Sequence, residues 1–532
     1  MKKYKVLCLI GSIVFFFGCT DFNDLNTDPT KSTDMDPRLM IPTVQMRQSE
    51  NHQEWARYLS YPAGFMNQWT GYWGTIEYGG RGQRYGNYME QMWVSYYPII
   101  IRDVVDIVHR TSDVPEKSNL NAIGRILKVQ CFHKLTDFYG DIPYFEAGMG
   151  AISGVIRPKY DKQEDIYKDL LKELAEASEQ LDPAGDEITY DLYYDGSILQ
   201  WKKFANSLRL RIAMRLIKVD PALARQEAEK AIAAGVFESN DDICYVKHEN
   251  TQVDSSGEGK QNGLAARLSV PEDPANNTFR VARELVETME NAKDPRLLYY
   301  AGSYYNDPSR TDITATIRAL KNSYAEMALP AQNFSWDDGI WEPAVTIEIG
   351  GRNVTIDHNQ QRLQPSKYIT ALDAPYIHIS YAEVKFLMAE AAVRTWNVGG
   401  GDAQSHYEEA LDAAVRQWSL FGVSNFDEDA ITAFVDFNRL KSGEELMQIN
   451  TQLWVLHFLD PIETWGNWRR TGMPDLKFKN VEPGKNNTNG QFPRRLEYPL
   501  EEQMKNKENL DEAIARMGGK DDWTNRVWWD KE

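Results

Sequence analysis

Apolar side chains that recur every three or four residues are the feature of this sequence that most limits its fold. One such stripe follows Lys162, a second follows Trp201, and a third lies within 123–138. This spacing places apolar side chains on one face of an α-helix, and that face must be buried against other helices. The stripes are Ile166, Leu170, Leu171, Leu174 and Leu181; Phe204, Leu208, Ile212, Leu216 and Val219; and Ile123, Ile126, Leu127, Cys131, Leu135 and Phe138. The sequence therefore predicts a helical protein.

The helices are expected to pair. Asp220-Pro221 opens a further short helix that ends at Gly235, because proline suits a first turn and glycine a helix end. The segments 381–396 and 405–418 are predicted helices with three glycines, Gly399 to Gly401, between them. Such hairpins are typical of tetratricopeptide-like units, although the roughly 34-residue consensus is absent.

The helical period fades between about Val246 and Pro375, where Gly, Pro, Asn and Asp are frequent. Alternating apolar residues within 345–349 and 354–356 flank Gly350-Gly351, which predicts a β-hairpin. We therefore expect an all-α dominated fold of tetratricopeptide-like helix pairs with a loop-rich region and a small β-hairpin. No linker divides the chain, so 36–532 is expected to form a single domain.

The first residues resemble a lipoprotein signal peptide. Three lysines precede an apolar run of 12 residues, Val6 to Phe17, which is too short for a membrane-spanning helix of about 20. The run ends at Gly18-Cys19, which resembles a lipobox, although Phe16 and Phe17 depart from its usual pattern. We expect 1–18 to be removed, Cys19 to be lipidated and 19–35 to be a tether, so that a lipid anchors the protein to a membrane. The acidic residues just after Cys19 resemble a lipoprotein surface-export signal, which implies a location on the cell surface at the outer membrane. A plain secretory signal is the alternative.

Composition and motifs exclude several classes of protein. The chain has 59 basic and 78 acidic residues, a net charge of −19, whereas a nucleic-acid-binding face must be basic. No HExxH, GxxxxGK[ST] or GxSxG motif and no CxxC pair occurs. We therefore expect no cofactor, metal or nucleic-acid partner.

The run Asp427–Asp429 could bind calcium. The preferred interpretation is the start of a helix, where the helix dipole favours acidic residues. Cys131 and Cys244 could pair or remain separate buried thiols.

Several segments in the same order resemble the SusD/RagB family of outer-membrane nutrient-binding lipoproteins. The core of 125–147 reads LTDFYGDIPY, a hallmark of that family, and ETWGNWRRTGMP at 463–474 points to its SusD-like-2 branch. Similar stretches occur at 201–216, 379–391 and 493–500. The resemblance covers nearly the whole chain.

This resemblance implies a helical fold with tetratricopeptide-like pairs and a partner, a SusC-like TonB-dependent transporter. It implies that the lipoprotein captures an oligosaccharide, or in some members a peptide, and delivers it to that transporter. Arg469 and Arg470 are expected to serve packing and salt bridges, and not to contact ligand.

One segment is rich in the side chains that bind sugars. Ten of the 33 residues from Phe65 to Tyr97 are aromatic, against 12% in the whole chain. Aromatic rings cover the C–H faces of sugars, and polar groups then orient the ligand. Glycines and the lack of an apolar period predict a loop over 69–85, whereas Trp93, Tyr96 and Tyr97 are expected in the core. The candidate ligand contacts here are Trp69, Tyr72, Trp73, Tyr78 and Arg81.

Tyr304, Trp336 and Trp341 are further candidates in the loop-rich region. A hydrolase would need two carboxylates flanking the glycosidic bond. The pairs Asp137 with Asp141 and Asp337 with Asp338 are weak candidates, and we expect no enzyme. The sequence favours a glycan-binding lipoprotein; a peptide ligand or a helical-repeat scaffold that binds no nutrient are the alternatives.

Overall fold

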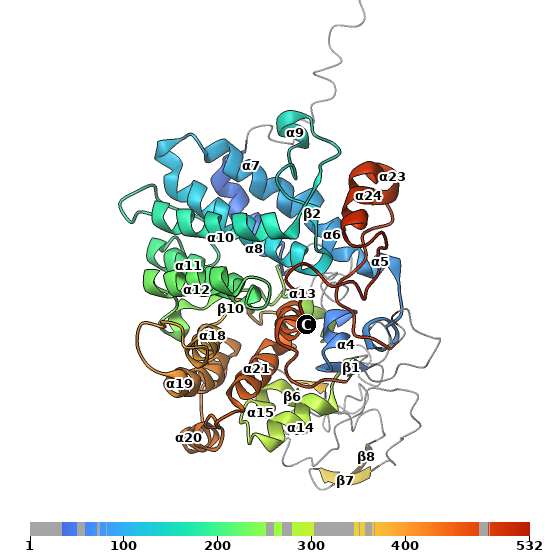
Figure 1. Ribbon diagram of the computed structural model, residues 1–532. Coiled ribbons are helices and arrows are strands. Elements are labelled where there is room, and N and C mark those ends of the chain that lie inside the picture. Colours follow the sequence, from blue (N-terminus) through green and yellow to red (C-terminus); the bar gives the residue numbers. More distant parts are fainter. Residues whose placement is uncertain are drawn as a thin grey trace, which may run out of the picture.

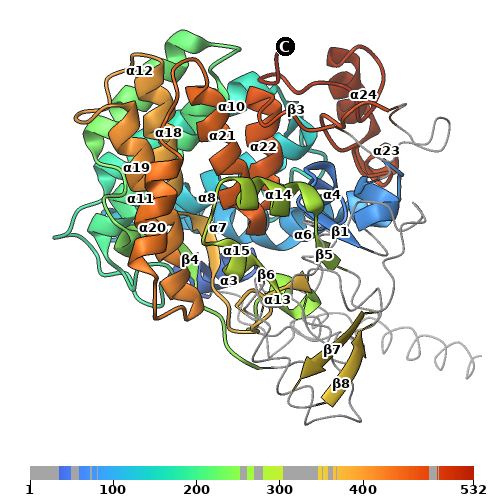
Figure 2. The ribbon, with the colours of Figure 1, turned by 90° about the horizontal axis from the view of Figure 1, so that it is seen from below.

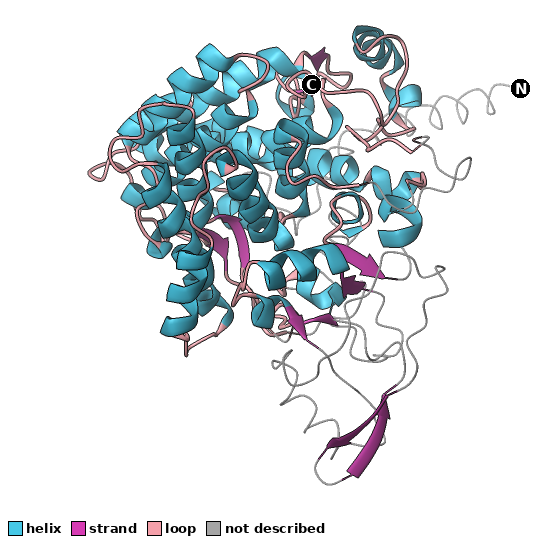
Figure 3. Ribbon diagram, turned by 60° about the horizontal axis from the view of Figure 1, so that its bottom comes forward, coloured by secondary structure: helices cyan, strands magenta, loops and turns pink. Residues whose placement is uncertain are grey.

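The computed structural model describes residues 35–49, 59–71, 75–80, 82–251, 260–268, 279–302, 345–349, 352–356, 364–366, 368–477, 488 and 490–532. Helices dominate this part of the chain, and short strands lie at several places among and beside them (Figures 1 and 3). This confirms the expected fold class.

The long helices pack side by side in chain order (Figure 1). Helix α8 lies between α7 and α10, α11 packs on α10 and α12, and α18 packs on α19. Figure 2 shows α21 and α22 beside these pairs, and α22 also contacts α4. Apart from the short α4 (Pro62–Phe65), these helices are α7 (Arg102–Thr111), α8 (Ser118–Tyr139), α10 (Gln163–Gln180), α11 (Ile198–Arg215), α12 (Pro221–Ala234), α18 (Tyr381–Val393), α19 (Ala403–Arg416), α21 (Glu445–Leu456) and α22 (Pro461–Thr471).

Local sequence sets the ends of these helices. The Asp220 side chain accepts a hydrogen bond from Leu223 N at 3.0 Å, and Pro221 occupies the first turn of α12. Ser380 caps α18 in the same way through Glu383 N. Helix α8 ends at Gly140, whose φ of 83° suits glycine. The predicted bounds therefore hold to within a few residues.

The shorter helices connect these pairs or carry the chain to its end. They are α3 (Ile41–Met46), α5 (Gly86–Met89), α6 (Gln91–Ser95), α9 (Gly150–Ser153), α13 (Gly263–Leu268), α14 (Arg283–Asn291), α15 (Leu297–Tyr300), α20 (Glu428–Phe437), α23 (Glu502–Lys505) and α24 (Lys507–Arg516). Single turns of 3-10 or π type are η1 (Pro37–Met40), η3 (Thr75–Gly80), η4 (Tyr96–Ile101), η5 (Pro115–Lys117), η6 (Asn240–Asp242), η7 (Gln417–Phe421) and η8 (His457–Leu459).

The strands form antiparallel pairs and no larger sheet within the described ranges. The pairs are β1 (Trp69–Gly71) with β5 (Phe279–Val281), β2 (Ile142–Pro143) with β3 (Tyr160–Asp161), β4 (Cys244–Val246) with β10 (Tyr376–Ile379), β6 (Ala301–Gly302) with β9 (Gln364–Pro365), and β7 (Val345–Ile349) with β8 (Arg352–Ile356). The last pair confirms the predicted hairpin, with Val345 opposite Ile356.

The core has two parts. The larger one fills the spaces between the helix pairs, and it includes Trp93 and Tyr96 as expected. The smaller one lies under the strands and includes Trp69, Tyr300 and Phe458. No helix among the described residues is both long enough and apolar enough to cross a bilayer. Cys131 and Cys244 are buried free thiols.

Candidate functional site

Trp69 is part of the core. Its ring is fully buried, stacks on Phe458 at a centroid distance of 4.2 Å and an angle of 6°, and donates from Nε1 to the Phe458 carbonyl oxygen at 3.1 Å. Strand β1 holds Trp69 opposite Val281. A ring packed in this way has no face left for a sugar, so the expectation that Trp69 contacts ligand is corrected. The prediction of a loop over 69–85 is also wrong in part, because β1 and η3 lie within it. The local sequence does not indicate which of its rings other parts of the chain cover.

Three tyrosines from the same segment gather at the surface. Tyr78 of η3 stacks on Tyr85 at 4.9 Å, and Tyr88 lies 5.2 Å from Tyr78 and 4.7 Å from Tyr85, between ring centroids. Tyr85 is 42% exposed, whereas Tyr78 and Tyr88 are half-buried. We call Tyr78, Tyr85 and Tyr88 the tyrosine platform.

The chain beneath holds the tyrosine platform in place. The Tyr61 hydroxyl accepts a hydrogen bond from Tyr85 N at 2.8 Å, and the buried Tyr61 ring lies 5.6 Å from Trp523. Arg84 forms an ion pair with Glu497, which ties the segment to the C-terminal part of the chain. The tyrosine platform is thus an anchored aromatic surface with polar side chains beside it.

Sequence reasoning named Tyr78 as a candidate contact and included Tyr85 at the end of the candidate loop over 69–85, but it did not name Tyr88. A signal was present, because Tyr88 lies in the same aromatic segment. The other candidate contacts and the lipidation site lie outside the described residues: Cys19, Tyr72, Trp73, Arg81, Tyr304, Trp336 and Trp341.

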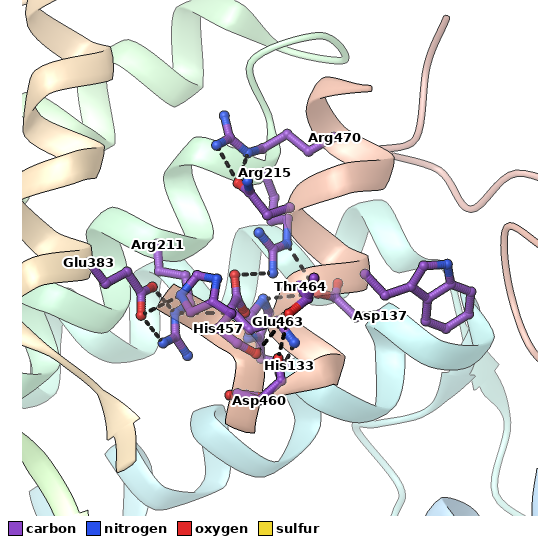
Figure 4. A network of polar contacts seen from close by, with 12 residues as sticks. His133, Asp137, Arg211, Arg215, Glu383, His457, Asp460, Glu463, Thr464 and Arg470 are labelled. Atoms are coloured by element: carbon purple, nitrogen blue, oxygen red, sulfur yellow. Dashed lines mark hydrogen bonds and ion pairs between the residues drawn. The ribbon is translucent and has the colours of Figure 1, made fainter. Parts of the chain in front are cut away.

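A network of buried charges joins the helix pairs (Figure 4). Arg211 of α11 donates to Glu383 of α18 at 2.6 and 2.5 Å. One turn further along α11, Arg215 contacts Glu463 of α22 at 2.6 Å and Asp137 of α8 at 3.2 Å. All five side chains are almost fully buried. The network therefore connects α8, α11, α18 and α22.

The electrostatics of this network favour the ionised carboxylates. Burial by itself would raise the pKa of Glu463, but Arg215 and Arg211 outweigh it and hold that pKa well below its ordinary value. Burial would likewise raise the pKa of Glu383, but Arg211 lowers it, and the pKa is below its ordinary value. Loss of such a carboxylate would leave its arginine buried without a counter-charge, so these groups have structural roles and are not poised to exchange protons with a substrate.

Asp137 and Asp141, one of the two weak candidate pairs for catalysis, also accept hydrogen bonds from neighbouring side chains and backbone. Asp137 accepts from Trp529 Nε1 at 3.0 Å and from the Tyr167 hydroxyl. Asp141 accepts from Gln163 N at 2.9 Å and from Arg516 Nε at 2.6 Å. Asp337 and Asp338 lie outside the described residues.

The two arginines of the WRRTG segment have the expected structural roles. The Arg469 guanidinium lies 3.8 Å from the ring centroid of Trp465 and 4.8 Å from that of Trp529, and Nη1 donates to the Asp137 carbonyl oxygen at 2.6 Å. Burial lowers the pKa of Arg469 to about 10. Arg470 is equally buried and pairs with Glu390. Both predictions are confirmed.

No group of three His, Cys, Asp or Glu side chains that could hold a metal ion occurs in the part of the chain that the structure describes. Asp427 caps α20 by accepting from Ala430 N at 3.0 Å, and Glu428 pairs with Arg416 at 2.7 Å. The acidic run is thus a helix start.

The comparison with known families decides the classification. The family described as SusD-like, starch-binding associating with outer membrane, matches residues 29–499. The chain belongs to the SusD-like family. Among curated proteins, none matches the chain significantly.

Solved SusD-like structures share this fold over nearly the whole chain. A chitin-binding protein is 33% identical, with a TM-score of 0.77, 93% of this chain covered and 100% of that one. A Bacteroidetes SusD-like protein, AC2a, is 30% identical, with a TM-score of 0.82 and coverage of 94% and 100%. A chitin-binding SusD homologue from Flavobacterium johnsoniae is 24% identical, with a TM-score of 0.69 and coverage of 93% and 98%.

Proposed function

We propose that this SusD-like protein is a cell-surface lipoprotein that captures oligosaccharides and delivers them to a SusC-like TonB-dependent transporter of the outer membrane. Family membership over residues 29–499 supports a role in nutrient binding at that membrane. The observation that carries the ligand class is the tyrosine platform, because an anchored, partly exposed aromatic surface suits the C–H face of a sugar ring.

Chitin-type oligosaccharides are the first ligands to test. Two of the similar structures are of proteins described as chitin-binding. Each sugar of such a chain presents an apolar face, which stacking can cover, and polar substituents, which hydrogen bonds can orient. The platform is proposed to contact the apolar faces.

The role is proposed to be binding without turnover. A glycosidase needs two carboxylates on either side of the scissile bond. Asp137 and Asp141 are instead held by Arg215 and Arg516 within the fold. Incubation of the protein with a chito-oligosaccharide is expected to yield no shorter product, and release of such a product would contradict this proposal.

The experiment is calorimetric titration of the soluble chain from Thr20 onward with chito-oligosaccharides, malto-oligosaccharides and peptides. Tyr85→Ala is expected to weaken glycan binding about tenfold, which corresponds to about 1.4 kcal/mol. Tyr190→Ala is the matched control, because Tyr190 is also exposed, at 64%, but lies in the connection between α10 and α11.

The result separates the candidate functions. Glycan binding that Tyr85→Ala weakens and Tyr190→Ala leaves unchanged supports the proposal. Equal glycan affinities for the wild type, Tyr85→Ala and Tyr190→Ala would contradict the tyrosine platform as the binding site. Peptide binding alone would favour peptide capture, and binding of neither class would favour a scaffold. Co-purification of a TonB-dependent transporter with the full-length lipoprotein tests the delivery step.

A further inference from the structure

A small cavity lies where the helix pairs meet the strand-rich side of the molecule. Its volume is about 50 Å³, and its walls come from α13, β10, η7, the end of α21 and η8. The side chains around it are mostly buried: Ala265 of α13 is 1% exposed, Trp418 of η7 is 2% exposed and His378 of β10 is 3% exposed. It is far below the roughly 300–1,000 Å³ of ordinary ligand pockets, so it is too small for an oligosaccharide.

Polar atoms of the residues lining this cavity lack a protein partner. Trp418 Nε1, Gln417 Oε1, His378 Nδ1 and His457 Nδ1 are buried and make no hydrogen bond to any described residue. Leaving such an atom unsatisfied costs about 1–3 kcal/mol. Four of them around one space indicate that the space contains a hydrogen-bonding guest.

His378 has one ring nitrogen engaged by a neighbouring side chain, whereas neither ring nitrogen of His457 makes a hydrogen bond to a described residue. His378 Nε2 lies 3.0 Å from the Tyr193 hydroxyl. His457 Nε2 lies 3.2 Å from Glu383 Oε2, and Arg211 fixes that carboxylate. Nδ1 of His378 and Nδ1 of His457 are therefore both available to a guest that offers hydrogen bonds.

The size of the cavity limits the guest. A buried water needs about 10–15 Å³ of such volume and two to four polar partners. We propose that a cluster of about three ordered water molecules occupies this cavity, accepts a hydrogen bond from Trp418 Nε1, donates to Gln417 Oε1 and bonds Nδ1 of both histidines.

The water cluster would add polar contacts between elements that lie far apart in the sequence. It links β10, η7 and η8, and through His457 it reaches the buried network of Glu383 and Arg211 (Figure 4). Tyr300, which also lines the cavity, stacks on Phe458 at 4.9 Å, and Phe458 stacks on Trp69. The waters thus support the inner end of the ring stack that begins in the aromatic segment. This inference does not depend on the proposed glycan ligand.

Crystallography of the soluble chain from Thr20 onward tests the cluster directly. The crystals should be grown and cooled without small polyols and should diffract well enough to show ordered water. We expect density peaks within hydrogen-bonding distance of Trp418 Nε1 and Gln417 Oε1. An empty cavity, or density of an organic additive, would overturn the proposal. Xenon pressurisation adds a second criterion, because empty apolar cavities bind xenon: we expect no xenon peak, and a peak would count against water.

The sign of a stability change gives an independent test. In a hydrated cavity, Gln417→Met removes an acceptor that binds water and is expected to lower the melting temperature. In a dry cavity, the same change removes an orphaned acceptor and would raise it. Gln226→Met on the exposed side of α12 is the control for the change of residue type. A rise for Gln417→Met relative to this control would contradict the water cluster.

Discussion

The guanidinium group of Arg470 forms two hydrogen bonds with the carboxylate of Glu390, at 2.7 and 2.8 Å, and both side chains are fully buried. The pair joins α22 to α18, although Arg470 and Glu390 are 80 positions apart in the sequence. Arg394, one turn after Glu390, donates to the same carboxylate at 2.8 Å. Because removal of one partner leaves the other charge buried without compensation, this contact is a sensitive point of the fold.

Glu390→Gln is expected to lower the free energy of unfolding by about 3–5 kcal/mol, since Arg470 would lose its buried counter-charge. Denaturant unfolding followed by circular dichroism measures this change. Asp511→Asn is the control, because the Lys507–Asp511 pair is exposed and contributes little. Equal stability of the two variants would show that the buried pair does not hold the helices together.

The same pair predicts a dependence of stability on pH. Burial would raise the pKa of Glu390, but Arg470 and then Arg394 outweigh it and lower that pKa to about 2 from an ordinary 4.5. The unfolded chain therefore binds the extra proton first, so this contribution is present above about pH 4.5 and is lost as the pH falls toward 2. Its full size is about 3 kcal/mol.

We expect the stability difference between the wild type and Glu390→Gln to be largest at pH 6 and to shrink at pH 3. Paired unfolding curves at the two pH values measure it. Other acidic groups titrate equally in both proteins and cancel in the difference. A difference that stays constant over this range would contradict the lowered pKa of Glu390.

Trp69→Ala is expected to destabilise the fold by about 3–5 kcal/mol, because it removes a fully buried ring and leaves a cavity beside Phe458. Chemical unfolding of the soluble protein measures the loss. Trp69→Phe is the milder comparison, since it keeps most of the ring stack but loses the hydrogen bond to the Phe458 carbonyl oxygen. An unchanged unfolding free energy together with weaker glycan binding would place Trp69 in the binding site after all.

Cys19→Ala tests the proposed lipid anchor. If the signal directs lipidation, the wild type partitions into the membrane fraction, whereas the variant lacks the acylated sulfur and is expected in the soluble fraction. Immunoblotting of fractionated cells of the source organism gives the readout, with Cys131→Ala as a control that keeps the anchor. A variant that remains with the membrane would refute lipidation at Cys19.

Local patterns explain what could be predicted. The stripe that begins at Ile166 and the cap Asp220-Pro221 gave helices close to α10 and α12, because helix formation depends on neighbours three or four residues away. The β7–β8 hairpin followed from alternation around two glycines. The buried charges also left a signal in the sequence: Glu383 and Glu390 lie seven positions apart in a largely apolar helix, and Arg211 and Arg215 lie four apart in another.

The roles of individual rings were not predictable in the same way. Trp69 and Tyr78 have similar local sequences, rich in glycine and aromatics, yet Trp69 is covered by Phe458 and Tyr78 lies at the half-exposed platform. The residue that covers Trp69 is 389 positions away.

The sequence by itself therefore determined the helical class, the order of the helices, the hairpin and the family, because each depends on local spacing or on motifs read along the chain. Only the tertiary structure decided that Trp69 belongs to the core, that Tyr78, Tyr85 and Tyr88 form one surface, and which charges are paired in the interior. Those outcomes depend on contacts between distant segments, where burial and electrostatic pairing select one arrangement among many that the local pattern allows.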